Sequence, residues 1–116
     1  MPEPEARLDT LDLSPTQLRI VREILARHAD GLTVWVFGSR ARGGAKPYSD
    51  LDLALITDRP MDLARQTALA DAFEQSDLPW RVDLVDWATT SDAFRRIIER
   101  DHIVIQAGEP GLHPVR

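Results

Sequence analysis

Residues 38–53 place a glycine-rich basic loop and an Asp-x-Asp pair between two apolar runs, and no other stretch constrains the fold of this chain as strongly. The apolar runs are residues 33–37 and residues 53–56. Short runs rich in β-branched, aromatic and aliphatic residues are typical of buried strands. We therefore predict a strand, a tight turn, a short helix and a loop, followed by a second strand that begins at the aspartates.

The turn after the first strand suits an anionic ligand. Gly38 and Ser39 follow the strand at once, so the first N–H groups of the next helix are directed at one point. Arg40 and Arg42 add positive charge, and they either contact a phosphate or offset the nearby carboxylates. Ser49 either caps the turn before the second strand or touches the ligand. Together these residues predict a phosphate-binding loop.

The second strand carries carboxylates on one face. Asp50 and Asp52 are two residues apart on a strand, so their α-carbons lie roughly 6–7 Å apart on the same side, while the alternating leucines belong in the core. Asp83, on a later predicted strand, is the natural third carboxylate. Such oxygens suit Mg²⁺, and two ions about 4 Å apart hold the attacking and leaving oxygens of an in-line displacement. An Asp-x-Asp pair alone is a weak signal, but its combination with the basic loop predicts a metal site for nucleotide chemistry.

The remaining segments predict an α/β (α+β) fold, a small mixed sheet packed with helices. Ser14 and Gln17 form a capping box at the start of the first helix. In the last helix, Phe94, Ile97 and Ile98 form an apolar stripe. The predicted elements, in order, are a helix from 14 to 30, strands at 33–37 and 50–57, a helix at 61–76, a strand at 80–87, a helix that starts at 89–91 and an edge strand at 102–105.

Length and charge narrow the class of protein. A chain of 116 residues suits one domain, residues 1–116, and we expect flexible tails at residues 1–7 and 108–116. The net charge of −5 argues against general nucleic-acid binding. There is no cysteine, no apolar run of about 20 residues and no apolar signal core, so we expect no membrane association and a cytoplasmic protein.

The combined motif resembles the signature of the DNA polymerase β-type nucleotidyltransferase superfamily: Gly38-Ser39, ten intervening residues, and then Asp50-x-Asp52. The fuller form, residues 37–43 (Phe-Gly-Ser-Arg-Ala-Arg-Gly) with residues 49–53 (Ser-Asp-Leu-Asp-Leu), is similar to the minimal nucleotidyltransferase (MNT) family. The match runs over residues 33–86, and the order of elements extends it over most of the chain.

The resemblance implies a magnesium-dependent transfer of a nucleoside monophosphate, AMP from ATP, to an acceptor hydroxyl with release of pyrophosphate. It implies two Mg²⁺ ions and assigns the metal to Asp50, Asp52 and Asp83, with Asp83 on the acceptor side. It gives Gly38 and Ser39 to the triphosphate. We add Arg40, Arg42 and Ser49, from the loop itself, as candidate nucleotide contacts.

The family also suggests where the acceptor comes from. Larger relatives carry an added domain for the acceptor or the base, whereas this chain has little sequence beyond the predicted core. Proteins of the minimal family resemble the antitoxin half of a pair whose other half is a helical HEPN-type toxin, which the antitoxin adenylylates. Two alternatives stay open: an enzyme that modifies a small molecule such as an aminoglycoside, with a homo-oligomer completing the pocket, and a binding subunit that neutralises its partner by contact alone.

Overall fold

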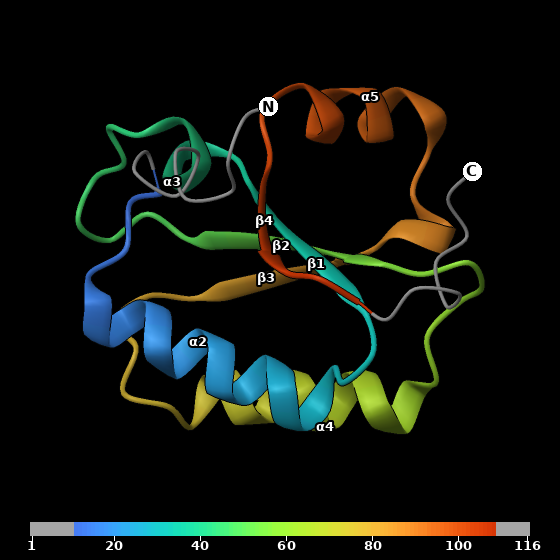
Figure 1. The fold of residues 1–116 in the computed structure, drawn as a ribbon, viewed down its shortest axis with the longest axis horizontal. Helices are drawn as coiled ribbons and strands as arrows, with labels where there is room; N and C mark the ends of the chain where they lie inside the picture. Colours follow the sequence, from blue (N-terminus) through green and yellow to red (C-terminus); the bar gives the residue numbers. More distant parts are fainter. Residues whose placement is uncertain (1–10, 109–116) are drawn as a thin grey trace.

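The fold is built on a four-stranded mixed sheet, as predicted. The computed structural model describes residues 11–108. The strands are β1 (Thr33–Phe37), β2 (Leu51–Ile56), β3 (Val82–Asp86) and β4 (Ile103–Gln106), in the spatial order β3-β2-β1-β4. β1 is antiparallel to both β2 and β4, while β2 and β3 are parallel (Figure 1).

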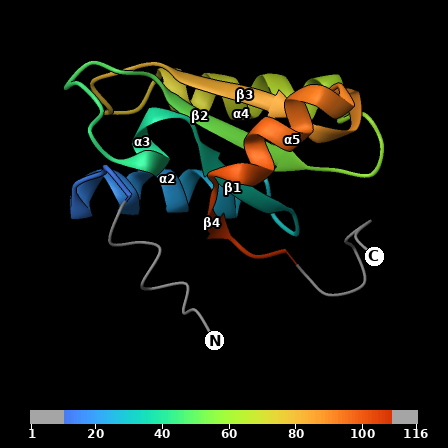
Figure 2. The same cartoon turned by 90° about the horizontal axis from the view of Figure 1, so that it is seen from above.

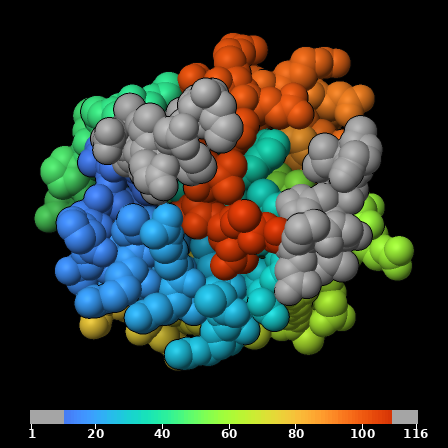
Figure 3. Space-filling model, in the orientation of Figure 1, coloured from blue at the N-terminus to red at the C-terminus, as the bar shows by residue number. Residues whose placement is uncertain are grey.

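Helices cover both faces of this sheet. α2 (Pro15–His28) and α4 (Leu63–Glu74) lie together on one face, and α5 (Asp92–Arg100) lies on the other, as Figures 1 and 2 show from two directions. The short helix α3 (Ser39–Arg42) follows β1 directly, and the 3₁₀ turn η1 (Trp87–Thr89) follows β3. β4 lies on the front surface between α2 and α5 in the space-filling view (Figure 3).

Local capping explains where the elements begin and end. The predicted box at α2 is present, because Ser14 Oγ accepts from the Gln17 N–H at 3.1 Å and Gln17 Oε1 accepts from the Ser14 N–H at 2.9 Å. α4 runs over Leu63–Glu74 rather than the predicted 61–76, and it begins at Leu63 because the Asp62 carboxylate caps it, accepting from the Arg65 N–H at 3.2 Å. β3 is shorter than the predicted 80–87 because Asp86 caps η1 and turns the chain there.

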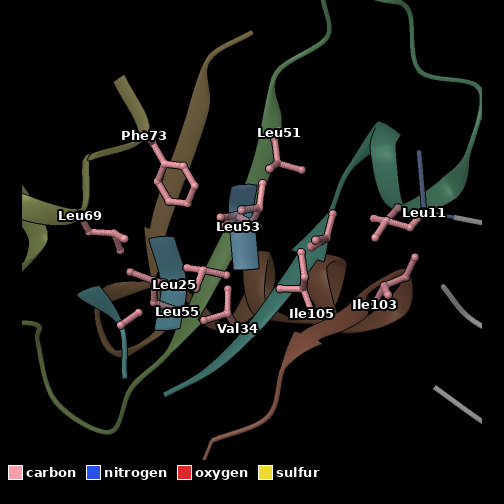
Figure 4. Packing of buried hydrophobic residues seen from close by; sticks show 14 of the residues in the cluster. Leu11, Leu25, Val34, Leu51, Leu53, Leu55, Leu69, Phe73, Ile103 and Ile105 are labelled. Atoms are coloured by element: carbon pink, nitrogen blue, oxygen red, sulfur yellow. The ribbon is translucent and has the colours of Figure 1, made fainter. Parts of the chain in front are cut away.

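The leucine face of β2 is the centre of the main core, as predicted. Leu51, Leu53 and Leu55 are fully buried, and they pack against Leu25 of α2 and Phe73 of α4 (Figure 4). The opposite face of the sheet supports a second, smaller cluster beneath α5. Its members are Phe37, Ala54, Ile56 and Ile98, with Trp35, Val85 and Trp87 packed against them. On β2 and β3 this cluster begins at Ala54 and Val85, so Asp52 and Asp83, which precede them on the same face, are left for the site.

The ends of the described chain are attached to the sheet. Leu11 is buried in the main core, and the Gly108 N–H donates to Thr33 Oγ1 at 3.0 Å. The flexible tails predicted at residues 1–7 and 108–116 lie outside the described residues, apart from Gly108. Within residues 11–108, we find no helix with the length and apolar character needed to cross a membrane.

Candidate active site

Two of the predicted carboxylates are neighbours on the sheet. Asp52 of β2 and Asp83 of β3 are direct partners in the parallel register. Adjacent strands lie about 4.8 Å apart, and partnered residues point to the same face. The structure therefore brings Asp83 to Asp52, and both carboxylates lie at the end of the sheet that α5 leaves open.

The carboxylates crowd one another electrostatically. Burial, together with the negative charges of Asp83 and Asp50, raises the pKa of Asp52 from 3.8 to about 6, and the positive charge of Arg42 opposes this rise. Asp50 lies directly before β2 and is half-buried. A group of like charges in a partly desolvated position favours a bound cation.

Arg81 is a site residue that the sequence analysis missed. Its Nη2 donates to Asp83 Oδ1 at 3.0 Å, and this ion pair raises the pKa of Arg81. The available signal was spacing, because residues 81 and 83 share a strand face. Among the described residues, no three acidic or histidine side chains converge into a ready metal site. Arg81 contacts Asp83 Oδ1, so it competes with any ion that binds this oxygen.

The glycine turn lies against Asp52. Phe37 is the register partner of Asp52, so Gly38 emerges beside that carboxylate. Gly38 has φ of 76° and ψ of −157°, and a β-carbon at this position would overlap Asp52 Oδ2. Only glycine fits both the backbone angle and the space.

Short helix α3 continues from this turn without a capping side chain. The first N–H groups of any helix have no acceptor within the helix. At α3, the N–H groups of Ala41 and Arg42 both donate to the Gly38 carbonyl, at 3.0 Å and 3.2 Å, so the groups left without an acceptor inside the helix are those of Ser39 and Arg40, beside the carboxylates. They are suited to bind phosphate oxygens, as the sequence predicted for Gly38 and Ser39.

Arg40 has a different role from the predicted nucleotide contact. Only 4% of Arg40 is exposed, and its guanidinium donates to the carbonyl oxygens of Asp12 at 2.8 Å and Ser49 at 3.0 Å. It also donates to the carbonyl of Pro47 at 3.1 Å, and it lies 4.4 Å from the centre of the Trp80 ring. Arg40 therefore holds the loop of residues 43–49 in shape.

The other two predicted nucleotide contacts differ from each other. Ser49 Oγ accepts from the Lys46 N–H at 3.1 Å, so Ser49 has the first of its two predicted roles, capping the turn. Arg42, in contrast, is exposed and lines the cleft that contains Asp52 and Asp83. Arg42, the last residue of α3, is therefore placed to contact an anion.

The cleft itself has a volume of about 560 Å³, which is within the range of small-molecule sites. The two aspartates lie in it, Gly38 and Arg42 border one side, and α5 borders the other. The apolar stripe of α5 is divided between two surroundings: Ile98 is buried, whereas Phe94 and Ile97 are exposed and line the cleft. The remaining lining residues are Phe37, Leu84, Val85 and Asp101.

Solved structures share this fold. A chain in the crystal structure of a toxin–antitoxin with AMP-PNP matches with a TM-score of 0.66 and 22% identity, over 79% of this chain and 74% of that one. A chain of the tri-AMPylated Shewanella oneidensis HEPN toxin in complex with MNT antitoxin matches with a TM-score of 0.58 and 22% identity, over 78% of this chain and 69% of that one. At such identities the likeness establishes the fold.

Sequence comparison establishes the family. The probable protein adenylyltransferase MntA of Haemophilus influenzae is 54% identical over 99 residues, which is 85% of this chain and 87% of that protein. The model of the nucleotidyltransferase domain family matches residues 18–110, which include the glycine turn and all three aspartates. The chain belongs to the nucleotidyltransferase domain family.

Proposed function

We propose that this protein is a magnesium-dependent adenylyltransferase that moves AMP from ATP to a hydroxyl group of a partner protein, as the antitoxin of a toxin–antitoxin pair. The observation that carries the proposal is the register of Asp52 against Asp83, with the Gly38 turn packed on Asp52. The similarity to a protein named as a probable protein adenylyltransferase supports the same activity.

The carboxylates fit the implied metal. Mg²⁺ takes one or two carboxylates and completes its shell with water and phosphate oxygens. Asp50, Asp52 and Asp83 supply such oxygens, and a divalent cation would relieve the repulsion that raises the pKa of Asp52. When bound, one or two Mg²⁺ ions neutralise phosphate charge and favour the ionised acceptor hydroxyl.

The residues of the chain then have distinct roles in the transfer. The Gly38-Ser39 turn and Arg42 hold the triphosphate, with the α-phosphorus facing the aspartates. Asp83 takes the proton from the acceptor hydroxyl, whose oxygen forms a bond to the α-phosphorus. The bond from the α-phosphorus to the oxygen that bridges to the β-phosphate breaks in line, and pyrophosphate leaves with that oxygen.

The partner is a helical HEPN-type protein. One of the matched structures contains an AMPylated HEPN toxin together with an MNT antitoxin, and others are described as MntA-HepT toxin–antitoxin structures. This chain shares the antitoxin-like fold and its motif. A protein acceptor also agrees with a cleft that is bordered by exposed surface and open to solvent at Asp83, whose side chain is 41% exposed.

The test is transfer of label to a HEPN-type protein encoded beside this gene. The purified pair is incubated with Mg²⁺ and ATP labelled at the α-phosphate, and the partner is then analysed by intact mass. We expect the mass of one or more AMP units on the partner and none with the Asp52→Asn variant. Label on an aminoglycoside but not on the partner, or neutralisation of the toxin by Asp52→Asn at wild-type potency, would contradict the proposal.

A further inference from the structure

The two ends of the cleft differ in chemistry. The α3 end contains Arg42 and the glycine turn, while the α5 end contains Phe94, Ile97 and Asp101. Among the described residues that line the cleft, Arg42 is the one cation. A triphosphate therefore belongs at the α3 end, because at the α5 end it would meet apolar surface and a carboxylate.

Phe94 and Ile97 are exposed although they lie on a helix that packs on the sheet. Their residues are 37% and 54% exposed, whereas Ile98 of the same helix is fully buried. The Phe94 ring is held by an edge-to-face contact with Phe37, with the ring centres 5.8 Å apart and the planes at 83°. The result is an ordered apolar wall, Phe94 and Ile97, beside an acidic site.

We propose that this wall binds the base of the nucleotide, with the ring of Phe94 as the stacking surface and Ile97 as its apolar border. The inference rests on the proposed function and deepens it, because it assigns the orientation of the nucleotide: phosphates toward α3 and base toward α5. Phe37 supports the connection, since it contacts Phe94 and directly precedes Gly38 at the phosphate turn.

Stacking on an aromatic side chain accepts any base, but its strength grows with the area of the base. The wall therefore favours purine over pyrimidine nucleotides. A protein side chain of the partner is the competing occupant. We favour the base over a partner side chain as the occupant, because the base is covalently joined to the phosphates that the Gly38 turn would hold. One ligand then matches both ends of the cleft.

The test is calorimetric titration with Mg²⁺ present, using ATP, UTP and inorganic tripolyphosphate. We expect wild-type protein to bind ATP more tightly than UTP, and Phe94→Ala to weaken ATP binding about tenfold while tripolyphosphate binding stays unchanged. Phe94→Leu keeps an apolar contact with Phe37 and should lose most of the same affinity. Leu63→Ala, at a 75% exposed leucine of α4 on the other face of the sheet, is the matched control and should behave as wild type.

The outcomes separate this inference from the proposed function. Equal affinity of the wild type for ATP and UTP, or an unchanged ATP affinity in Phe94→Ala, would overturn the proposed base site. Binding of tripolyphosphate in the same experiment would still support the phosphate site. Loss of partner capture in Phe94→Ala, with ATP affinity retained, would assign the wall to the partner instead. Failure of the wild type to bind either ATP or tripolyphosphate would overturn both proposals.

Discussion

Asp52 and Asp83 stand side by side on two parallel strands, although they are 31 positions apart in the sequence. Their pairing is produced by the crossover through α4. This crossover brings β3 to the edge of β2 that lies opposite to β1. The position of Asp83 therefore depends on the fold of the whole domain. An isosteric substitution at this position tests the role of its charge without changing the size of the side chain.

Asp83→Asn should lower AMP transfer by about 10²–10⁴-fold, because the amide keeps the size of the side chain but cannot accept the proton. Nucleotide binding should persist, since the Gly38 turn and Asp52 are unchanged. The measurement is transfer of label to the partner, with thermal melting as the control for folding. A variant that transfers AMP at the wild-type rate would remove Asp83 from the mechanism.

Asp86→Asn should have the opposite effect to Asp83→Asn: AMP transfer should continue, while the free energy of unfolding should fall. The Asp86 carboxylate accepts from the Met61 N–H at 2.8 Å, from the Ala88 N–H at 3.3 Å and from the Thr57 hydroxyl. Replacing one oxygen by an amide leaves at least one of these donors without its acceptor, at a cost of about 1–3 kcal/mol in the free energy of unfolding. Loss of transfer in a folded Asp86→Asn protein would mean that the roles of the two aspartates are exchanged.

Asp52→Asn should stabilise the metal-free protein at neutral pH. The pKa of Asp52 is raised from 3.8 to about 6 on folding, so its contribution to stability is complete below about pH 4 and is lost as the pH rises through 6. Because Asn does not titrate, the variant should exceed the wild type in melting temperature at pH 7.5 and lose this advantage near pH 4. The shift corresponds to at most about 3 kcal/mol, and partial exposure of the side chain reduces that figure.

The ion pair of Arg81 with Asp83 competes with metal binding. Arg81→Gln removes both the competing partner and a like charge, so the affinity for Mg²⁺ or Mn²⁺ should increase about two- to fivefold, the range expected for an exposed pair. Calorimetric titration with the metal alone measures this without any need for activity. Weaker metal binding in Arg81→Gln would show that Arg81 orients Asp83 for the ion rather than competing with it.

Gly38→Ala should reduce nucleotide affinity by at least about tenfold, because the new methyl group would meet the Asp52 carboxylate and displace it. Gly44→Ala is a matched control: Gly44 has φ of 78°, but a β-carbon there would have nothing within 4 Å. Both variants place a side chain at a positive φ, which costs about 1–3 kcal/mol, and only Gly38→Ala should also disturb the site. Equal ATP affinities in the two variants would contradict this account.

Much of the site followed from local sequence patterns. Ser14 with Gln17 predicted the helix start, and the alternation around Asp52 predicted which face of β2 would form the main core, because capping and strand periodicity depend on neighbouring residues alone. Alternation also placed Asp83 and Asp86 on opposite sides of β3. These features could be predicted because a short stretch of chain contains all the groups involved.

Other roles depend on contacts between distant segments. Arg40 was predicted to bind nucleotide, but its guanidinium is buried by the Asp12 carbonyl, 28 residues earlier, and by the ring of Trp80. The helical pattern of α5 predicted one apolar stripe, but packing against the sheet buries Ile98 in the cluster with Ala54 and Ile56, while Phe94 lines the cleft. The sequence by itself determined the elements, the glycine turn and the acidic residues, since these depend on local geometry. Only the tertiary structure decided which arginine holds the loop and which apolar side chains face the ligand, because burial and hydrogen bonding there are set by residues far away in the chain.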